Sequence, residues 1–183
     1  MTPADRVIAE IEQNQAKTYL PIIGPEKGQV LVKMVKLVRP KLVVEVGTLV
    51  GYSALLIAKH LPDAGRVVTF EIDREVAKIA KKNIEIAGFS HKIDLIVGDA
   101  KKTLGRIGKQ VDLLFLDAAK EEYLAYLKLV EPLLRKKAVV VADNVKIFAD
   151  DVSDFLEYVR YSGKYNSEVF DFGQDAVEVS IKL

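Results

Sequence analysis

The sequence contains no cysteine and no tryptophan among its 183 residues. Without cysteine, the chain has no disulfide framework, no thiolate nucleophile and no cysteine-ligated zinc site. It also lacks an excess of charge of either sign, because 27 basic and 26 acidic residues give a formal net charge of +1. A chain so close to neutrality has no general attraction to nucleic acid or to acidic membranes.

Long uncharged apolar runs are missing too. No stretch of 18 or more apolar residues is free of charge, which argues against a transmembrane helix. The N-terminal stretch MTPADRVIAEIEQ has acids where a signal peptide needs an apolar core. We therefore expect a soluble, cytoplasmic protein with a single domain over residues 1–183, made of an N-terminal helical segment (1–40) and an α/β core (41–183).

After about residue 40, short segments rich in Val, Ile and Leu alternate with helical patterns. The strand-like segments cover residues 42–46, 66–72, 92–97, 111–117 and 137–143. Consecutive apolar residues in several of them are typical of strands covered on both faces. The clearest helical patterns cover 74–87, with Asp73 as N-cap and Gly88 as stop, and 120–134. This alternation predicts a doubly wound, mostly parallel α/β sheet.

The two ends of the chain depart from the alternation. Residues 167–173 and 176–183 are strand-like and only a few turn residues apart, which favours an antiparallel hairpin. We therefore predict seven strands, with an antiparallel strand at the C-terminal end. The first 40 residues predict two helices outside the sheet, at 3–15 and 26–38.

The stretch VVEVGTLVGYSAL joins the first strand to a helix through the pattern E-x-G-x-x-x-G, formed by Glu45, Gly47 and Gly51. Ligands of open α/β sheets bind beyond the carboxyl ends of strands, where glycine lets the backbone come close to them. Leu49 and Tyr52 stand where the dinucleotide fingerprint needs glycine, and no P-loop sequence follows. The pattern favours a ligand with a compact polar end, and a tight turn without a ligand is the alternative.

A second acid, Glu71, ends the second strand about 20 residues after this loop. An acid at that point can accept hydrogen bonds from the two ribose hydroxyls of an adenosine ligand. A surface acid beside a helix N-terminus is the alternative for Glu71 alone. Together, the loop and Glu71 favour a nucleoside cofactor.

With these features the chain resembles the doubly wound (class I, Rossmann-like) S-adenosylmethionine-dependent methyltransferases. Within them it is similar to the cation-dependent O-methyltransferases that include catechol and caffeoyl-coenzyme A O-methyltransferases. The similarity runs from about Ile23 to Val145, with a weaker match at the C-terminal hairpin. Six stretches in order carry it: GPEKGQVL, VVEVGTLVGYSAL, VTFEID, VGDAKKTL, LFLDAAKEEY and VVADNV.

The resemblance implies S-adenosylmethionine as cofactor and assigns its site to residues from several of these stretches. The residues are Ile23, Gly24, Glu45, Gly47, Gly51, Ser53, Glu71, Ile72, Asp99, Ala100 and Asp117. Glu45 and Gly47 would hold the methionine part, with Ser53 nearby, and Glu71 would bind the ribose. Asp99 and Ala100 would lie beside the adenine, and Ile23 and Gly24 would cover the site.

Two further strands end in polar residues, Asp117 after one and the pair Asp143-Asn144 after the other. The topology brings these ends together, and two carboxylates with one amide oxygen make a set suited to a hard cation. N-capping of the following helices by Asp117 and Asn144 is the alternative. The resemblance makes the three residues ligands of Mg²⁺ or a similar divalent cation.

Lys120 lies in the first turn of a predicted helix, the end at which the helix dipole disfavours a cation. A broken stability rule of this kind points to function. The family uses a lysine here as general base, so the resemblance implies that Lys120 takes the proton of a substrate hydroxyl. The alternative is an exposed lysine balanced by Glu121 and Glu122. The predicted reaction is cation-assisted methyl transfer to a hydroxyl of a catechol-like or vicinal-diol small molecule.

The substrate itself does not follow from the resemblance. Ala118 and Ala119 stand where the catechol enzymes have larger side chains, and a helical pattern follows Asn144 almost directly. We expect other elements to complete the pocket, either the Ile147-Phe148 pair or an N-terminal helix carrying Val7, Ile8 and Ile11, and we expect a homodimer that partly encloses the site.

Three other functions compete with this prediction. A methyltransferase acting on a hydroxylated tRNA nucleoside would suit an open site, although the near-zero net charge does not favour nucleic acid. A nucleotide-linked oxidoreductase lacks its glycine fingerprint. A non-catalytic cofactor-binding module would have no need of Asp117, Lys120 and Asp143 together.

Overall fold

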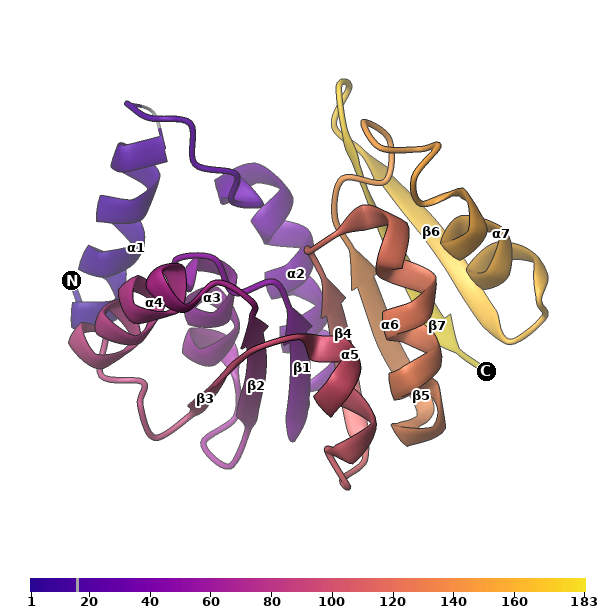
Figure 1. Cartoon of the computed structure of the whole chain (residues 1–183), viewed down its shortest axis with the longest axis horizontal. Helices are drawn as coiled ribbons and strands as arrows, with labels where there is room; N and C mark the ends of the chain where they lie inside the picture. Colours follow the sequence, from indigo (N-terminus) through magenta and orange to yellow (C-terminus); the bar gives the residue numbers. More distant parts are fainter. Residues whose placement is uncertain (16) are drawn as a thin grey trace.

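The computed structural model describes residues 1–15 and 17–183, in which seven strands form one sheet with the order β3-β2-β1-β4-β5-β7-β6 (Figure 1). The strands are β1 Leu42–Val46, β2 Arg66–Glu71, β3 Ile93–Val97, β4 Val111–Leu116, β5 Leu134–Ala142, β6 Tyr165–Asp171 and β7 Ala176–Lys182. Strands β1 to β5 pair in parallel, whereas β7 runs antiparallel to both of its neighbours. The doubly wound, mostly parallel sheet with its antiparallel C-terminal strand is thus confirmed.

Helices cover both faces of the sheet. They are α1 Pro3–Gln15, α2 Gly24–Val38, α3 Tyr52–His60, α4 Arg74–Ile86, α5 Ala100–Thr103, α6 Tyr123–Val130 and α7 Ser153–Tyr161, with short 3₁₀ turns η1 Leu104–Arg106, η2 Lys120–Glu122 and η3 Glu131–Leu133. One hydrophobic cluster joins the sheet to α1, α2, α3 and part of α4, and a second joins its other face to α5, α6 and α7. Within the described residues, no helix is both long and apolar enough to cross a bilayer.

The consecutive apolar residues of the central strands follow from this double cover. Val43 and Leu113 belong to the cluster with α1–α3, whereas their neighbours Val44 and Leu114 belong to the cluster with α5–α7. All four side chains are completely buried. Because successive strand residues point to opposite faces, a strand buried on both faces needs an apolar residue at almost every position.

The helix boundaries agree with the sequence where a cap marks them. Helix α1 has the predicted bounds, and the Asp73 carboxylate accepts from the backbone N–H groups of Glu75 and Val76, at 2.7 and 3.1 Å, at the start of α4. The prediction of one helix over residues 120–134 is wrong. It divides into η2, α6 and η3, and Pro132 lies in the last of these, where the chain leaves the α-helix.

The expectation that the apolar side of the N-terminal helix is free for packing is also wrong. Val7, Ile8 and Ile11 are between 3% and 8% exposed and belong to the core cluster of their own chain. Helix α1 lies against α3 and α4 (Figure 1). The burial of these side chains within one chain leaves no apolar patch on α1 to form a substrate wall or a subunit contact.

Candidate active site

The carboxyl ends of β1, β2, β4 and β5 lead to one cavity of about 790 Å³. Of the residues predicted from the sequence, the following line it: Ile23, Gly47, Ser53, Glu71, Ile72, Asp99, Ala100, Asp117, Lys120 and Asn144. Four predicted residues do not line it, namely Gly24, Glu45, Gly51 and Asp143. The fold therefore brings most of the predicted residues together from segments spread over more than a hundred positions.

Gly47 allows the ends of β1 and β4 to meet. Its φ is +104°, and a Cβ atom at this position would lie 2.1 Å from the carbonyl oxygen of Asp117. The backbone N–H of Asp117 in turn donates to the carbonyl of Val46, at 2.9 Å. Glycine at 47 is thus required by the close approach of two strand ends, and this approach places Asp117 beside the loop that follows β1.

Glu45 is a completely buried acid on β1, directly opposite Thr69 on β2. The hydroxyl of Thr69 donates to Glu45 Oε2 at 2.5 Å, whereas Glu45 Oε1 has no hydrogen-bond partner in the described part of the chain. Burial raises the pKa of the Glu45 carboxyl to about 7, against the lowering effect of Ser53 and Thr69. A buried oxygen without a partner calls for a donor from a bound ligand.

Glu71 organises the loops at the end of β2. One carboxylate oxygen accepts from the N–H of Leu49 at 2.8 Å, and the other accepts from the N–H of Asp73 at 2.9 Å. Each oxygen of an ionised carboxylate accepts more than one hydrogen bond. Glu71 can therefore hold the two loops and still bind hydroxyl groups in the cavity that it lines.

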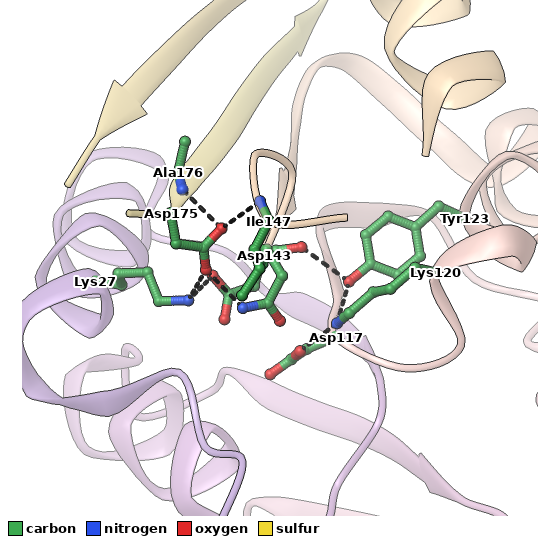
Figure 2. A network of polar contacts seen from close by, with 9 residues as sticks. Lys27, Asp117, Lys120, Tyr123, Asp143, Ile147, Asp175 and Ala176 are labelled. Carbon is green, nitrogen blue, oxygen red and sulfur yellow. Dashed lines mark hydrogen bonds and ion pairs between the residues drawn. The ribbon is translucent and has the colours of Figure 1, made fainter. Parts of the chain in front are cut away.

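Lys120 is held between two polar groups at the cavity wall. Its Nζ donates to Asp117 Oδ1 and to Tyr123 Oη, each at 2.8 Å, and Tyr123 Oη donates to the backbone carbonyl of Asp143 at 3.0 Å (Figure 2). Only 14% of the Lys120 side chain is exposed. The alternative of a surface lysine balanced by Glu121 and Glu122 is thereby excluded.

Asp143 continues β5 beside Asp117. Its backbone N–H donates to the carbonyl of Leu116 at 3.0 Å, and its side chain is almost completely buried. Burial and the neighbouring Asp117 carboxylate raise the pKa of Asp143 to about 7, although Lys27 Nζ lies 2.7 Å from its Oδ1 atom and opposes the rise. Burial also raises the pKa of Asp117, against the effect of Lys120. Burial thus disfavours the charged form of both acids, and a bound cation would favour it.

Asn144 follows at the end of the strand with φ +60°, and its Nδ2 donates to Asp175 Oδ2 at 2.7 Å. Neither η2 nor α7 has a side-chain N-cap, so the capping alternative for Asp117 and Asn144 is wrong. The helix after Asn144 begins only at Ser153. Residues 145–152 form turns that carry Ile147 and Phe148, both lining the cavity.

Sequence reasoning missed Lys27 and Asp175, which complete the polar network in Figure 2. Lys27 Nζ lies 2.7 Å from Asp143 and 2.6 Å from Asp175, with 15% of its side chain exposed. Lys27 belongs to the stretch GPEKGQVL, which carries part of the family resemblance, so a signal for it existed. Asp175 lies in the turn between the last two strands. Because Asp is common in turns, the sequence gives no signal for its role.

The residues at the ends of β4 and β5 fit a hard cation. The described residues contain no group of three or more His, Asp or Glu side chains arranged for a metal. The candidate donors at these two strand ends are the carboxylates of Asp117 and Asp143 and the amide of Asn144. All three donors are oxygen atoms. Such a set suits Mg²⁺, whereas softer metals prefer nitrogen or sulfur ligands. Asp143 Oδ1 is buried and its neighbour in the described residues is the Lys27 ammonium, 2.7 Å away, so a cation that binds Asp143 would share this oxygen with Lys27 or use Oδ2.

Known proteins share both the sequence pattern and the fold. The sequence model of the O-methyltransferase family matches residues 2–160. The chain belongs to this family. Catechol O-methyltransferase B of Danio rerio is 40% identical over 174 residues, which cover 88% of this chain and 65% of that protein. The chain thus spans slightly less than two thirds of the length of this relative.

Solved structures of O-methyltransferases superpose over nearly the whole chain. The enzyme from Bacillus cereus, solved in complex with SAH, has a TM-score of 0.88 and 26% identity, covering 97% of this chain and 91% of that one. TomG from Streptomyces achromogenes, solved in complex with SAM, has a TM-score of 0.85 and 26% identity, covering 96% and 89%. This O-methyltransferase-family chain therefore has the class I methyltransferase fold.

Proposed function

We propose that the protein binds S-adenosylmethionine and transfers its methyl group to a hydroxyl of a catechol-like or vicinal-diol small molecule, assisted by a divalent cation. The observation that carries the proposal is the convergence of Asp117, Lys120, Asp143 and Asn144 beside a cavity that Ser53 and Glu71 also line. The family to which the chain belongs supports it, as do SAH and SAM bound in the structures that it resembles.

The cofactor would lie along the ends of β1, β2 and β3. When bound, it supplies an electrophilic methyl group on a sulfonium. The unpartnered Glu45 Oε1 suits the ammonium of its methionine part, with Gly47 and Ser53 beside it. Glu71 offers carboxylate oxygens to the ribose hydroxyls. The adenine would then reach Ile72, Asp99 and Ala100, which also line the cavity.

Asp117, Asp143 and Asn144 would hold the cation. When bound, a divalent cation orients adjacent oxygens and makes a hydroxyl more acidic. The hydroxyl proton then has to be removed, and Lys120 lines the cavity beside these ligands. Asp117 and Tyr123 fix its Nζ at the cavity wall. As general base, Lys120 would accept the hydroxyl proton on Nζ and become the ammonium that donates to these two groups.

The turn after Asn144 supplies an apolar wall for the substrate. Ile147 is 60% and Phe148 is 41% exposed, and both line the cavity. The Phe148 ring centre lies 6.0 Å from Lys120 Nζ, which puts an aromatic face next to the proposed base. A planar substrate ring can pack there with its hydroxyl near Lys120.

Methyl transfer from labelled cofactor tests the proposal, with Mg²⁺ or with excess chelator, on catechol, a caffeoyl thioester and a hydroxylated tRNA nucleoside. We expect transfer to the catechol-like substrates that chelator abolishes, while calorimetry shows that SAH still binds and NAD does not. Asp143→Ala should behave as chelator does. Transfer that persists in chelator would refute the metal role, and transfer to the nucleoside alone would establish the RNA-directed alternative.

A further inference from the structure

Asp175, in the turn between β6 and β7, connects the elements that surround the proposed metal ligands (Figure 2). Its Oδ2 accepts from Lys27 Nζ at 2.6 Å and from Asn144 Nδ2 at 2.7 Å. Its Oδ1 accepts from the backbone N–H of Ala176 at 2.8 Å and from that of Ile147 at 3.3 Å. One carboxylate thus joins α2, the end of β5, the turn after it and β7.

The hydrogen bond between Asp175 and Asn144 decides which end of the amide faces the proposed cation. An ionised carboxylate can only accept hydrogen bonds, so the amide nitrogen of Asn144 must be the atom that faces Asp175. The amide oxygen then points away from Asp175. Hard cations bind amides through oxygen, so a rotated Asn144 would present two N–H donors to the cation and repel it.

Lys27 reduces the repulsion that Asp175 would meet from the acids Asp117 and Asp143. Without Lys27, Asp175 would add a further negative charge beside the buried carboxylate of Asp143. The Lys27 ammonium lies between the two carboxylates, 2.7 Å from Asp143 and 2.6 Å from Asp175. Lys27, which belongs to α2, therefore offsets the repulsion between the carboxylates of Asp143 and Asp175.

We propose that Asp175 is a positioning residue for the cation site: held by Lys27, it turns the amide oxygen of Asn144 toward the cation. The proposal rests on the proposed function, in which Asp117, Asp143 and Asn144 hold the cation. Such partners of ligands are a common requirement of metal sites, and their loss lowers metal affinity about 10- to 100-fold.

The test measures Mn²⁺ affinity of the whole chain by calorimetry and the electron paramagnetic resonance spectrum of the bound ion. Asp175→Ala should weaken Mn²⁺ binding by about 10- to 100-fold, with SAH affinity in the metal-free protein unchanged. Asp171→Ala is the matched control, because Asp171 is an exposed acid of the same hairpin whose ion pair is with Lys146. The control should leave Mn²⁺ affinity unchanged.

A double-mutant cycle separates positioning from a simple loss of charge. If Asp175 acts through Asn144, Asp175→Ala should weaken Mn²⁺ binding far less in an Asn144→Ala background than in the wild type. Equal losses in both backgrounds would overturn the proposal. Asp175→Asn keeps the side-chain volume and an acceptor for the Asn144 amide, so it should bind Mn²⁺ more tightly than Asp175→Ala and keeps the test open if the alanine variant does not fold.

The same titrations distinguish this proposal from the proposed function. Wild-type affinity in both Asp143→Ala and Asn144→Ala would overturn the metal site and the positioning role together. Weak binding in those two variants, with wild-type affinity in Asp175→Ala, would overturn the positioning role alone and leave the metal site standing.

Discussion

The buried carboxyl of Glu45 should make the stability of the ligand-free protein depend on pH. Burial raises its pKa from 4.5 to about 7. The charged groups that act on it, Asp117 of the β4 end and Glu71 of β2, both raise the pKa further, and Ser53 and Thr69 only partly oppose the rise. The folded protein therefore binds the Glu45 proton more tightly than the unfolded chain does.

The sign and size of the effect follow from linkage. A group whose pKa is higher in the folded state stabilises fully below its unfolded pKa, and this stabilisation is lost as the pH rises through the folded pKa. For Glu45 the loss falls between about pH 4.5 and pH 7. It amounts to about 2 to 3 kcal/mol between pH 5 and pH 8, since one pKa unit corresponds to about 1.4 kcal/mol.

Urea unfolding followed by circular dichroism, at pH 5 and at pH 8, measures this term as the difference between the wild type and Glu45→Gln. The variant keeps the size of the side chain and cannot ionise. Relative to the wild type, it should gain about 2 to 3 kcal/mol of unfolding free energy on going from pH 5 to pH 8. Glu75→Gln, which removes an exposed acid from α4, is the control.

An equal difference in unfolding free energy between Glu45→Gln and wild type at the two pH values would refute the reasoning, because it would mean that the pKa of Glu45 is the same in the folded and unfolded states.

The raised pKa of Glu45 also has a consequence for ligand binding. If the cofactor ammonium binds Glu45, the carboxylate form is favoured and binding should release a proton near pH 6.5. Calorimetry in two buffers of different ionisation enthalpy would detect the release, and Glu45→Gln should lack it.

Four further predictions concern separate parts of the molecule. Lys120→Met should lower turnover about 10²- to 10⁴-fold while SAH affinity stays the same, and unchanged turnover would remove the base from the mechanism. Glu71→Ala should weaken SAH binding by about 1.5–3 kcal/mol, which calorimetry would show. Arg160→Ala leaves the buried Glu178 without its two hydrogen bonds from α7, at 2.9 and 2.7 Å. The substitution should lower the free energy of unfolding in urea by about 3 kcal/mol. A loss of less than about 1 kcal/mol would mean that Glu178 finds another partner. Sedimentation at micromolar concentration should show a homodimer, and a monomer would contradict that expectation.

The parts of the fold that sequence predicted are those that short-range patterns determine. Runs of Val, Ile and Leu indicate strands that are buried on both faces. Asp73 indicates the start of α4 because an N-cap is a local interaction. The division of residues 120–134 was missed because the helical periodicity continues past the point where Pro132 ends the α-helix. The burial of Val7, Ile8 and Ile11 was missed because an amphipathic helix does not reveal what covers its apolar side.

In the candidate site, too, the residues set by local patterns could be predicted, and those set by contacts between distant segments could not. Asp117, Asp143 and Asn144 could be predicted because strand ends of a parallel sheet meet at one edge, so position along the chain translates into position in space. Asp175 could not, since its ion pair with Lys27 joins residues 148 positions apart and depends on the path of the final hairpin. The need for glycine at 47 likewise could not be predicted in full, since its missing side chain makes room for the carbonyl of Asp117, which lies 70 positions further along the chain. The ligand-binding role that the sequence predicts for Gly47 stays a prediction.

The carboxyl edge of the sheet has an acidic surplus that a nearly neutral chain does not suggest. In the described part of the chain, acids outnumber lysines around it, the acids being Glu45, Glu71, Asp99, Asp117, Glu122, Asp143 and Asp175 and the lysines Lys27, Lys101 and Lys120. Such a surplus is costly in a buried site. Burial first, and the neighbouring carboxylates in addition, raise the pKa values of Glu45 and Asp143 in the ligand-free protein. Positively charged ligands relieve the same cost. An ammonium and sulfonium on one side and a divalent cation on the other would each take the place of a proton, so both ligands should bind more tightly as the pH rises from 6 to 8.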